Sequence, residues 1–440
     1  MLGERRPRVT AADGTNAGAG VSPDAAPAPR GAWRDPVTAA VAAAAFGAYF
    51  ALSLFRLLQL NPGSWDLGMY TEYVKQLSLL RAPVVDIRGP GFDLLGDHFQ
   101  VGLAVLAPFF RLVPSPATLL FFQALATALS VFPVAAAGTA LAGRTTGRLI
   151  GFAYAFSWGL QQMIDFDFHE VALAVPLLAF SLSALVRRRP RAAIAWAVPL
   201  VFVKEDQGFT VAAIGLLLGV TAAFPSILSA LPVPPGGLRA MRRGESFAGG
   251  HGYDRVALWG GLFLVAWGLF WSVLAITVII PHFNPAHDYG FWEDGGVVGG
   301  GRPFSVGSLI GQTASGWPTK LQTVVLLLLP TAFAALGSPV ALLALPSLAL
   351  RFMSTDTAFW GTDWHYNATL MPILFIAAAE ATGRWQRAPS RAWPAVPGPA
   401  RDLAAAARTG VARHGGAVMA AVAVALAFQF PLSGLWQGQT

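Results

Sequence analysis

The chain of 440 residues contains no cysteine, and its 30 basic residues include only three lysines. Without cysteine there is no disulfide, no thiolate metal site and no cysteine nucleophile. Charged residues are also scarce, at 12% of the chain against roughly 25% in soluble domains, whereas 55% of the residues are hydrophobic. The composition therefore excludes an ordinary soluble domain and predicts a membrane protein.

The sequence also lacks the short motifs of common soluble enzymes. It has no phosphate-binding loop, no dinucleotide-binding fingerprint after a strand, no G-x-S-x-G and no H-E-x-x-H. Charges within the apolar runs are nearly absent, and most charges lie where a run ends. A pathway for protons or ions should place ionisable groups in the middle of membrane helices. This distribution therefore favours chemistry at a membrane face over transport.

Candidate transmembrane helices are apolar runs that approach the roughly 20 residues needed to cross a bilayer. They are 37–58, 116–142, 149–164, 170–187, 191–203, 208–230, 257–281, 320–336, 338–351, 366–383 and 416–434. A further run, 99–113, is shorter and is typical of a re-entrant or interfacial helix. The predicted fold is all-α, a polytopic membrane protein with about 11 transmembrane helices.

The arginines set the predicted orientation. With a cytoplasmic N-terminus and no crossing by 99–113, 21 of the 27 arginines lie on the cytoplasmic side, as the positive-inside rule requires. If 99–113 did cross, every later loop would change sides and most arginines would face outward. We therefore predict a multi-pass protein of the inner (plasma) membrane whose active face is extracytoplasmic. We interpret the net charge of +7 as a topology signal and expect no nucleic-acid partner.

This topology divides the chain into four predicted parts. They are a disordered cytoplasmic tail over 1–35, a transmembrane domain over 36–383 with its first extracytoplasmic loop at 61–115, a basic cytoplasmic loop over 384–415, and a final transmembrane helix within 416–440. Polar clusters that interrupt the apolar runs all fall on the outer face. We expect their side chains to converge on one cavity: Asp66, Asp97, His98, His169, Glu205, Asp206 and His365.

Asp66, Asp97 and His98 are the catalytic candidates. Asp66 follows Trp65 just beyond the first span, where it can act as a general base or only cap a short helix that lies on the bilayer. Asp97 and His98 precede 99–113 and can bind a metal, shuttle a proton or cap that helix. The carboxylates suffice for a divalent cation, Mg or Mn, but no fixed ligand spacing identifies a metal site, so a cofactor is left open.

A second group of polar residues forms the candidate substrate site. Its members are Trp65, Asp167, His169, Glu170, Lys204, Glu205, Asp206, His365 and Tyr366. Each has a structural alternative. Trp65 can be an interfacial anchor, Asp167 can cap the helix that follows it, and Lys204 can form a local ion pair. Three charges at the end of a short apolar run are nevertheless costly to bury and are usually functional.

Five motifs in this order resemble a family of predicted polytopic bacterial membrane proteins. They are WDLG at 65–68, LGDHF at 95–99, FDFHE at 166–170, KEDQG at 204–208 and HYNATLMP at 365–372. That family is similar in architecture to the GT-C glycosyltransferase superfamily, whose members have a large first extracytoplasmic loop with membrane-parallel helices and a catalytic Asp. The resemblance covers roughly residues 37–383.

The resemblance implies a membrane-embedded glycosyltransferase with Asp66 as general base. It would move a sugar from a polyprenyl-phosphate donor in the lipid bilayer to an envelope glycan or protein acceptor. A basic side chain would hold the phosphate; the candidates are Lys204, Arg88, Arg302 and Arg351. His98, His169 and His365 would assist by hydrogen bonding. The sugar, the acceptor and the stereochemical outcome stay open. The alternatives are a transporter or flippase of a lipid-linked or small polar substrate, and a non-catalytic scaffold in envelope assembly.

Overall fold

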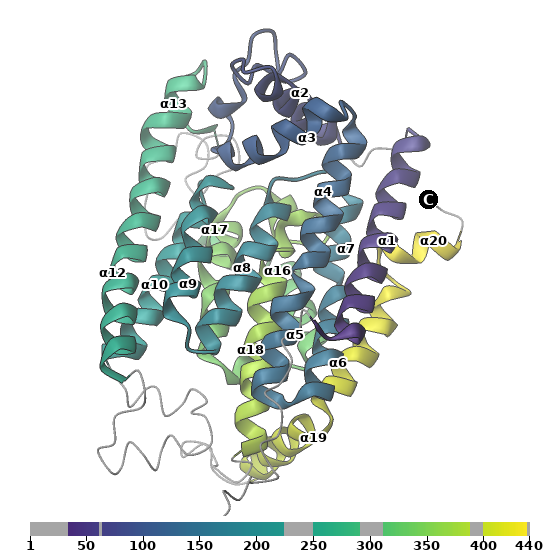
Figure 1. Ribbon diagram of the computed structural model, residues 1–440, viewed down its shortest axis with the longest axis vertical. Coiled ribbons are helices and arrows are strands. Elements are labelled where there is room, and N and C mark those ends of the chain that lie inside the picture. The colour runs from purple at the N-terminus through teal and green to yellow at the C-terminus, as the bar shows by residue number, and fades with distance from the viewer. Residues whose placement is uncertain (1–33, 61–63, 224–249, 291–310, 388–398, 438–440) are drawn as a thin grey trace, which may run out of the picture.

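The apolar runs fold into helices that lie side by side along the long axis of the protein (Figure 1). The computed structural model describes residues 34–60, 64–223, 250–290, 311–387 and 399–437. Within these ranges the only β pairing is one isolated bridge, between Val84 and Asp93. The prediction of an all-α membrane protein is confirmed.

The helices follow the predicted runs closely in order. They are α1 (Pro36–Leu58), α2 (Asp66–Ser78), α3 (Ala107–Leu112), α4 (Pro116–Leu129), α5 (Val131–Ala142), α6 (Arg144–Ala155), α7 (Trp158–Asp165), α8 (Val171–Val186), α9 (Pro190–Ala197), α10 (Gln207–Ala223), α12 (Gly250–Leu274), α13 (Ile280–Phe283), α16 (Trp317–Leu328), α17 (Leu345–Met353), α18 (Leu370–Arg387), α19 (Pro399–Ala427) and α20 (Gly434–Gln437). Short 3₁₀ segments join several of them.

Four helical segments in the described ranges are long and apolar enough to cross a membrane. They are Pro36–Leu58, Pro116–Ala142, Arg255–Phe283 and Ala405–Ala427. The shorter apolar segments are Val101–Leu112, Val171–Val186, Pro190–Phe202, Gln207–Ala223 and Pro339–Met353. The number of about 11 spans therefore stays a prediction.

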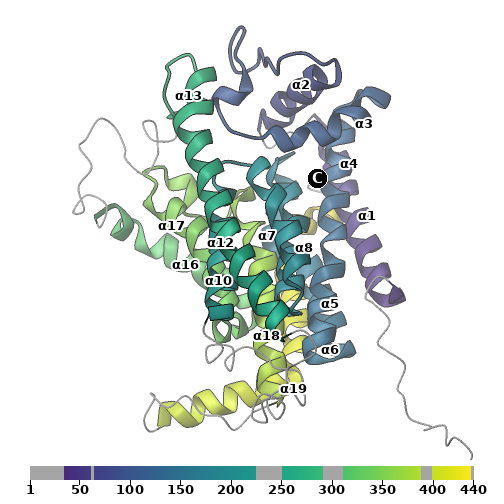
Figure 2. The ribbon, with the colours of Figure 1, turned by 60° about the vertical axis from the view of Figure 1, so that its left-hand side comes forward.

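Several helix boundaries differ from the predicted runs. The predicted span 149–164 begins earlier, at Arg144, and is divided into α6 and α7 by a short break at Phe156 and Ser157. The predicted loop 384–415 is partly helical, because α18 continues to Arg387 and α19 begins at Pro399. The early part of α19 is rich in alanine, the strongest helix former. Figure 2 shows this part lying across the end of the body opposite α2.

α18 is the centre of the helical body. Every residue from Leu370 to Gly383 is buried, and α18 packs against α5 and α8. On one side of the body, α10 and α12 approach closely through glycines. A Cβ on Gly208 would lie 2.3 Å from the carbonyl oxygen of Gly268, which is too close for any side chain. Small residues at such crossings let membrane helices pack backbone to backbone.

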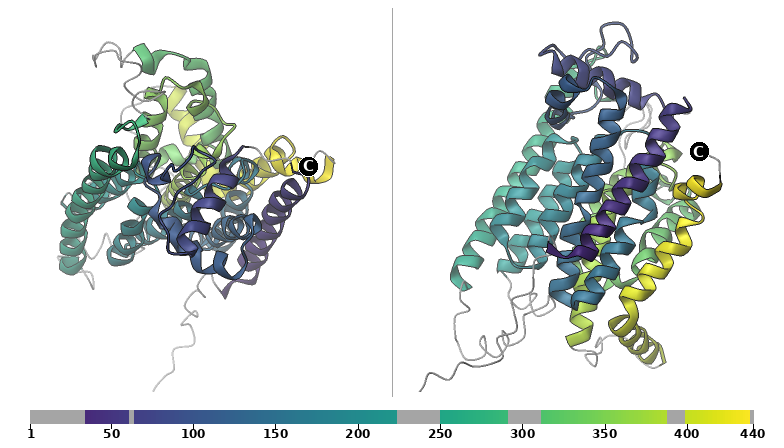
Figure 3. Two further views of the ribbon diagram at one scale, coloured as in Figure 1. Left: turned by 90° about the horizontal axis from the view of Figure 1, so that it is seen from above. Right: turned by 45° about the vertical axis from the view of Figure 1, so that its right-hand side comes forward.

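The segment 64–115 covers one end of the helical body, as the view from above shows (Figure 3). Tyr70, Tyr73 and Val74 of α2 are buried against Leu103 and Phe110 in a small apolar core of their own. This core fixes the beginning of α2, where Asp66 lies, over the ends of the other helices.

At the opposite end, Asp35 fastens the beginning of α1. Its side chain accepts a hydrogen bond from the backbone N–H of Thr38 at 3.1 Å, and the guanidinium groups of Arg144 and Arg148 lie 2.7 and 2.6 Å from one carboxylate oxygen. Asp35 thus joins the start of α1 to the start of α6.

Candidate functional site

The site begins with a carboxylate–imidazole pair between distant parts of the chain. Asp66 is the first residue of α2, and His169 lies in the turn between α7 and α8. The His169 Nε2 atom lies 3.2 Å from Asp66 Oδ2, and its Nδ1 atom lies 3.0 Å from Glu170 Oε2. The hydroxyl of Tyr70 also donates to Glu170. The His169 ring is therefore held between two carboxylates.

This arrangement determines the charges of the pair. Burial alone would raise the pKa of Asp66, but the hydrogen bond and the charge of His169 outweigh it and lower the pKa. Burial alone would lower the pKa of His169, whereas Glu170 and Asp66 raise it. Opposite charges within hydrogen-bond distance stabilise each other's charged form. We therefore treat His169 as an imidazolium between ionised carboxylates.

The turn that carries His169 has an unusual backbone held by a buried amide. Asp167 has a positive φ of 76°, which few residues other than glycine adopt. Gln123 of α4 donates to the carbonyl of Asp167 at 2.5 Å and accepts from the backbone N–H of His169 at 2.9 Å. The Asp167 carboxylate accepts from the backbone N–H of Ser64 at 2.9 Å, so it joins this turn to the start of α2.

The structure also decides between two alternatives raised by the sequence. Trp65, and not Asp66, is the N-cap residue of α2. The Asp66 carboxylate contacts the His169 ring and accepts a hydrogen bond from the Ser64 hydroxyl. Glu170 occupies the N-cap position of α8, so the interpretation of Asp167 as a cap is wrong as well. Both carboxylates instead make contacts between distant segments.

Lys204 connects the network of Asp66, His169 and Glu170 to the carboxylate of Glu205. Its ammonium lies 2.9 Å from Glu170 Oε1, and the Glu170 side chain is completely buried. The adjacent residue, Glu205, accepts from the backbone N–H of Phe99 at 3.0 Å and from the Tyr289 hydroxyl at 2.8 Å. Glu205 also lies 2.7 Å from His98 Nδ1. The turn between α9 and α10 therefore contacts both the α7–α8 turn and the segment 64–115.

The charge state of His98 follows from this contact. Burial and the nearby Lys204 lower the pKa of the His98 imidazole, but the Glu205 carboxylate more than compensates and raises it overall. His98 is consequently a cation held on Glu205. His98 forms an ion pair within the protein and does not line the cavity beside Lys204.

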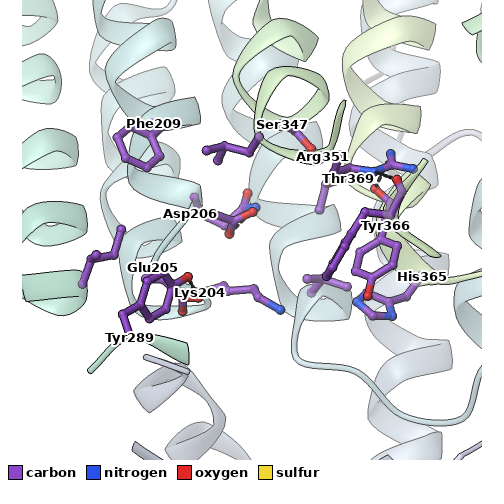
Figure 4. Close-up of a pocket in the computed structure, with 15 residues that line it drawn as sticks. Lys204, Glu205, Asp206, Phe209, Tyr289, Ser347, Arg351, His365, Tyr366 and Thr369 are labelled. Atoms are coloured by element: carbon purple, nitrogen blue, oxygen red, sulfur yellow. Dashed lines mark hydrogen bonds between the residues drawn. The ribbon is translucent and has the colours of Figure 1, made fainter. Parts of the chain in front are cut away.

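A cavity of about 110 Å³ lies between the start of α10, α17 and the segment that precedes α18 (Figure 4). Its polar lining consists of Lys204, Glu205, Asp206, Gln207, Tyr289, Ser347, Arg351, His365, Tyr366 and Thr369. Its apolar lining consists of Val171, Phe209, Ile276, Leu350 and Phe359. Figure 4 shows Lys204 extending across the cavity toward His365. Cations, carboxylates, hydroxyls and aromatic rings thus face one shared space.

Arg351 forms one wall of the cavity and also shapes it. Its guanidinium donates to the carbonyls of Phe359 at 2.9 Å and Gly361 at 3.1 Å, and to the side-chain oxygen of Asn367 at 2.9 Å. These bonds hold the irregular segment between α17 and α18. Among the described residues, no carboxylate forms an ion pair with Arg351. Its positive charge is therefore available to an anion in the cavity.

The predicted residues separate into three groups. Asp66, His169, Glu170 and Lys204 form one hydrogen-bonded network. Lys204, Glu205, Asp206, His365 and Tyr366 line the cavity. The remaining four lie elsewhere: Trp65 is exposed, Asp167 holds the turn, Asp97 pairs with Arg88 at 3.0 Å, and His98 pairs with Glu205.

Sequence reasoning missed three supporting residues. Tyr70 and Tyr289 donate to the two central glutamates, and Gln123 holds the turn below His169. A polar amide inside the apolar run 116–142 was the one available signal. Arg302, a candidate phosphate ligand, lies outside the described residues. In the described part of the chain, no group of three or more His, Asp or Glu side chains is arranged to hold a metal ion.

Comparison with known proteins identifies a family. The model of the family described as predicted membrane protein (DUF2079) matches residues 56–433, so the chain belongs to this family. The match extends over both halves of the site, from Asp66 to His365. Neither the curated proteins nor the solved structures contain a match.

Proposed function

We propose that this member of the DUF2079 family is a membrane-embedded glycosyltransferase that moves a sugar from a polyprenyl-phosphate donor to an extracytoplasmic envelope acceptor. The observation that carries the proposal is the cavity itself. It combines buried cations, carboxylates and aromatic rings next to the Asp66–His169 pair. The likeness to the GT-C superfamily in the first outer loop, noted from the sequence, agrees with this chemistry.

A phosphate would find two cations in the cavity. Lys204 extends into it, and Arg351 lines the opposite side (Figure 4). Basic side chains form short, charge-assisted hydrogen bonds to phosphate oxygens. Placed beside a departing phosphate, they would stabilise the negative charge that develops as the sugar leaves. Arg351 carries no carboxylate partner among the described residues and Lys204 is shared with Glu170 alone, and we propose that both cations are needed to bind the donor phosphate.

The rest of the lining suits the sugar and the acceptor. Glu205 and Asp206 can accept hydrogen bonds from sugar hydroxyls, and the rings of Tyr289, Tyr366 and Phe359 offer flat apolar surfaces. Small-molecule sites commonly combine apolar walls with a few convergent polar groups in this way. We propose that Asp66 supplies the negative charge on which the acid–base chemistry of the site depends.

The topology completes the proposal. We propose about 11 crossings of the inner membrane, a cytoplasmic N-terminus, and an outer face at the end covered by the segment 64–115. The GT-C-like transmembrane domain would be 36–383. In this orientation the cavity lies near the outer leaflet, where a polyprenyl chain can remain among the lipids while its phosphate enters between helices.

Turnover by the purified protein tests this function. The full chain in lipid nanodiscs would be incubated with polyprenyl-phosphate-linked hexoses and pentoses and with envelope glycan acceptors, and release of polyprenyl phosphate would be measured. Asp66→Asn should lower turnover by about 10²-fold or more, the range for groups used in acid–base catalysis. Asp363→Asn is the matched control, because Asp363 is exposed. Equal turnover by wild type and Asp66→Asn would contradict the proposal.

A transporter or flippase is the second candidate function. The observation in its favour is the completely buried Glu170, which lies with Lys204 and His169 inside the helical body. Buried ionisable groups of this kind also mark transport pathways. Movement of a fluorescent polyprenyl phosphate between leaflets of proteoliposomes, without sugar transfer, would favour transport over the enzyme.

A further inference from the structure

His365 is a cavity residue whose two ring nitrogens have no hydrogen-bond partner among the described residues. The side chain is buried, with 4% of the residue exposed. Neither ring nitrogen has a hydrogen-bond partner in the part of the chain that the structure describes. Buried polar atoms are almost always hydrogen-bonded, and an unpaired one calls for a ligand or for water. Because His365 lines the cavity, its partner should be a molecule bound there.

The His365 ring lies directly on the ring of His169. The two imidazole centroids are 3.4 Å apart and the ring planes differ by 19°. Phe166 stacks on both rings, with its centroid 5.4 Å from that of His365. The position of His365 is therefore fixed by the same turn that Gln123 and Asp167 hold, and the ring has little freedom to turn away from the cavity.

Stacking on a charged imidazole makes His365 a neutral one. His169 is ionised between Asp66 and Glu170, and two cations cannot share such a contact without a large electrostatic cost. Burial comes first among the causes that hold the pKa of His365 well below its ordinary value, and the positive charge of His169 comes next. A neutral imidazole has a lone pair that can accept a proton.

The other charged groups around His365 shift its pKa in opposite directions. Lys204, from the α9–α10 turn, and Arg351, from α17, lower its pKa further. Glu170, from the α7–α8 turn, acts against them and raises it. The sum of these effects keeps His365 uncharged at neutral pH, as a general base must be before it reacts.

We propose that His365 is the general base that contacts the acceptor, and that Asp66 is a positioning residue that acts on it through His169. This inference rests on the proposed glycosyl transfer. As the acceptor oxygen forms its bond to the anomeric carbon, the hydroxyl proton passes to a ring nitrogen of His365, and the negative charge that develops on the departing phosphate offsets the transient positive charge on this ring. The bond between that carbon and the phosphate oxygen breaks, and polyprenyl phosphate leaves with the electron pair. His365 then returns the proton to water.

Turnover measurements separate this inference from the function itself. His365→Gln keeps a polar side chain of similar size and removes the base, so kcat should fall about 10²- to 10⁴-fold with a smaller change in KM. His282→Asn is the control, because His282 is exposed in the same outer region. Wild-type kcat in a folded His365→Gln variant would overturn the inference and leave the glycosyltransferase standing. Absence of turnover by the wild type would overturn both.

A direct titration tests the electrostatic part without any substrate. In the full chain labelled with ¹⁵N-histidine, the His365 signal, assigned by its loss in His365→Gln, should be that of a neutral ring at pH 7. Protonation should begin only well below the ordinary pKa of about 6.5. In His169→Asn the neighbouring positive charge is removed, so the His365 pKa should rise and the acid limb of the rate profile should move to higher pH. A charged His365 at pH 7, or no shift in His169→Asn, would overturn the proposed coupling.

Discussion

Replacement of Lys204 by methionine should destabilise the protein strongly, because it leaves a buried carboxylate without its cation. Lys204 Nζ lies 2.9 Å from Glu170 Oε1, and the exposed fractions of the two side chains are 13% and 0%. Breaking a buried ion pair by removing one partner typically costs about 3–5 kcal/mol. Glu170 would retain His169 and Tyr70. We therefore expect a loss near the lower limit, about 3 kcal/mol.

A double-mutant cycle gives the assay its specificity. Lys204→Met, Glu170→Gln and the double variant would be unfolded by a denaturing detergent in mixed micelles, with the exposed Lys75→Met as control. Interacting residues show coupling energies of about 0.5–3 kcal/mol. The double variant should therefore be more stable than the sum of the single losses implies. Strict additivity, or a Lys204→Met variant as stable as Lys75→Met, would refute the ion pair as a buried, stabilising contact.

Three further predictions concern parts of the protein outside the cavity. Gly208→Ala should destabilise the protein by about 1–3 kcal/mol in the same unfolding assay, because the added Cβ would lie 2.3 Å from the Gly268 carbonyl oxygen. Gly219→Ala on the same helix is the control, because a Cβ there meets no atom within 4 Å. Asp35→Ala should lower the free energy of unfolding by about 0.5–2 kcal/mol for the lost helix cap alone. Arg148, above all, lowers the pKa of Asp35, so the Asp35 carboxylate stabilises the protein at neutral pH. This stabilisation should vanish as acid protonates the wild-type carboxylate. Single cysteines at Asp86 and Pro114, both exposed in a chain without cysteine, should label from the same side of the membrane if 99–113 does not cross; labelling from opposite sides would overturn the topology.

The helices were predictable because their signal is local. An apolar run of sufficient length becomes a helix wherever it packs, so α1 begins within one residue of the predicted start and α8 matches its run at both ends within one residue. The start of α6 was missed because Arg144 and Arg148 look like loop residues. They are helical in contact with Asp35, and a contact across more than a hundred residues leaves no pattern in the local sequence.

Many residues of the site could be identified from the sequence, but the contacts between them could not. Charge at the ends of apolar runs pointed to Lys204, Glu205 and His169, since burying such groups is costly without partners. Which partner each group takes depends on how distant turns meet. Asp97 was a catalytic candidate along with Asp66, but it pairs with Arg88. The stacked rings of His169 and His365, 196 positions apart in the sequence, have no signal along the chain.

Binding of a polyprenyl phosphate tests the central claim most directly, because the proposed function requires the cavity to hold a lipid-linked phosphate. Native mass spectrometry of the full chain with polyprenyl monophosphate would compare the wild type with Lys204→Met and the exposed control Lys75→Met. We predict a bound lipid in the wild type and in Lys75→Met, and at least tenfold weaker binding in a folded Lys204→Met, a difference of about 1.4 kcal/mol. Equal binding by all three proteins, or none by the wild type, would contradict the assignment of this cavity to the donor phosphate.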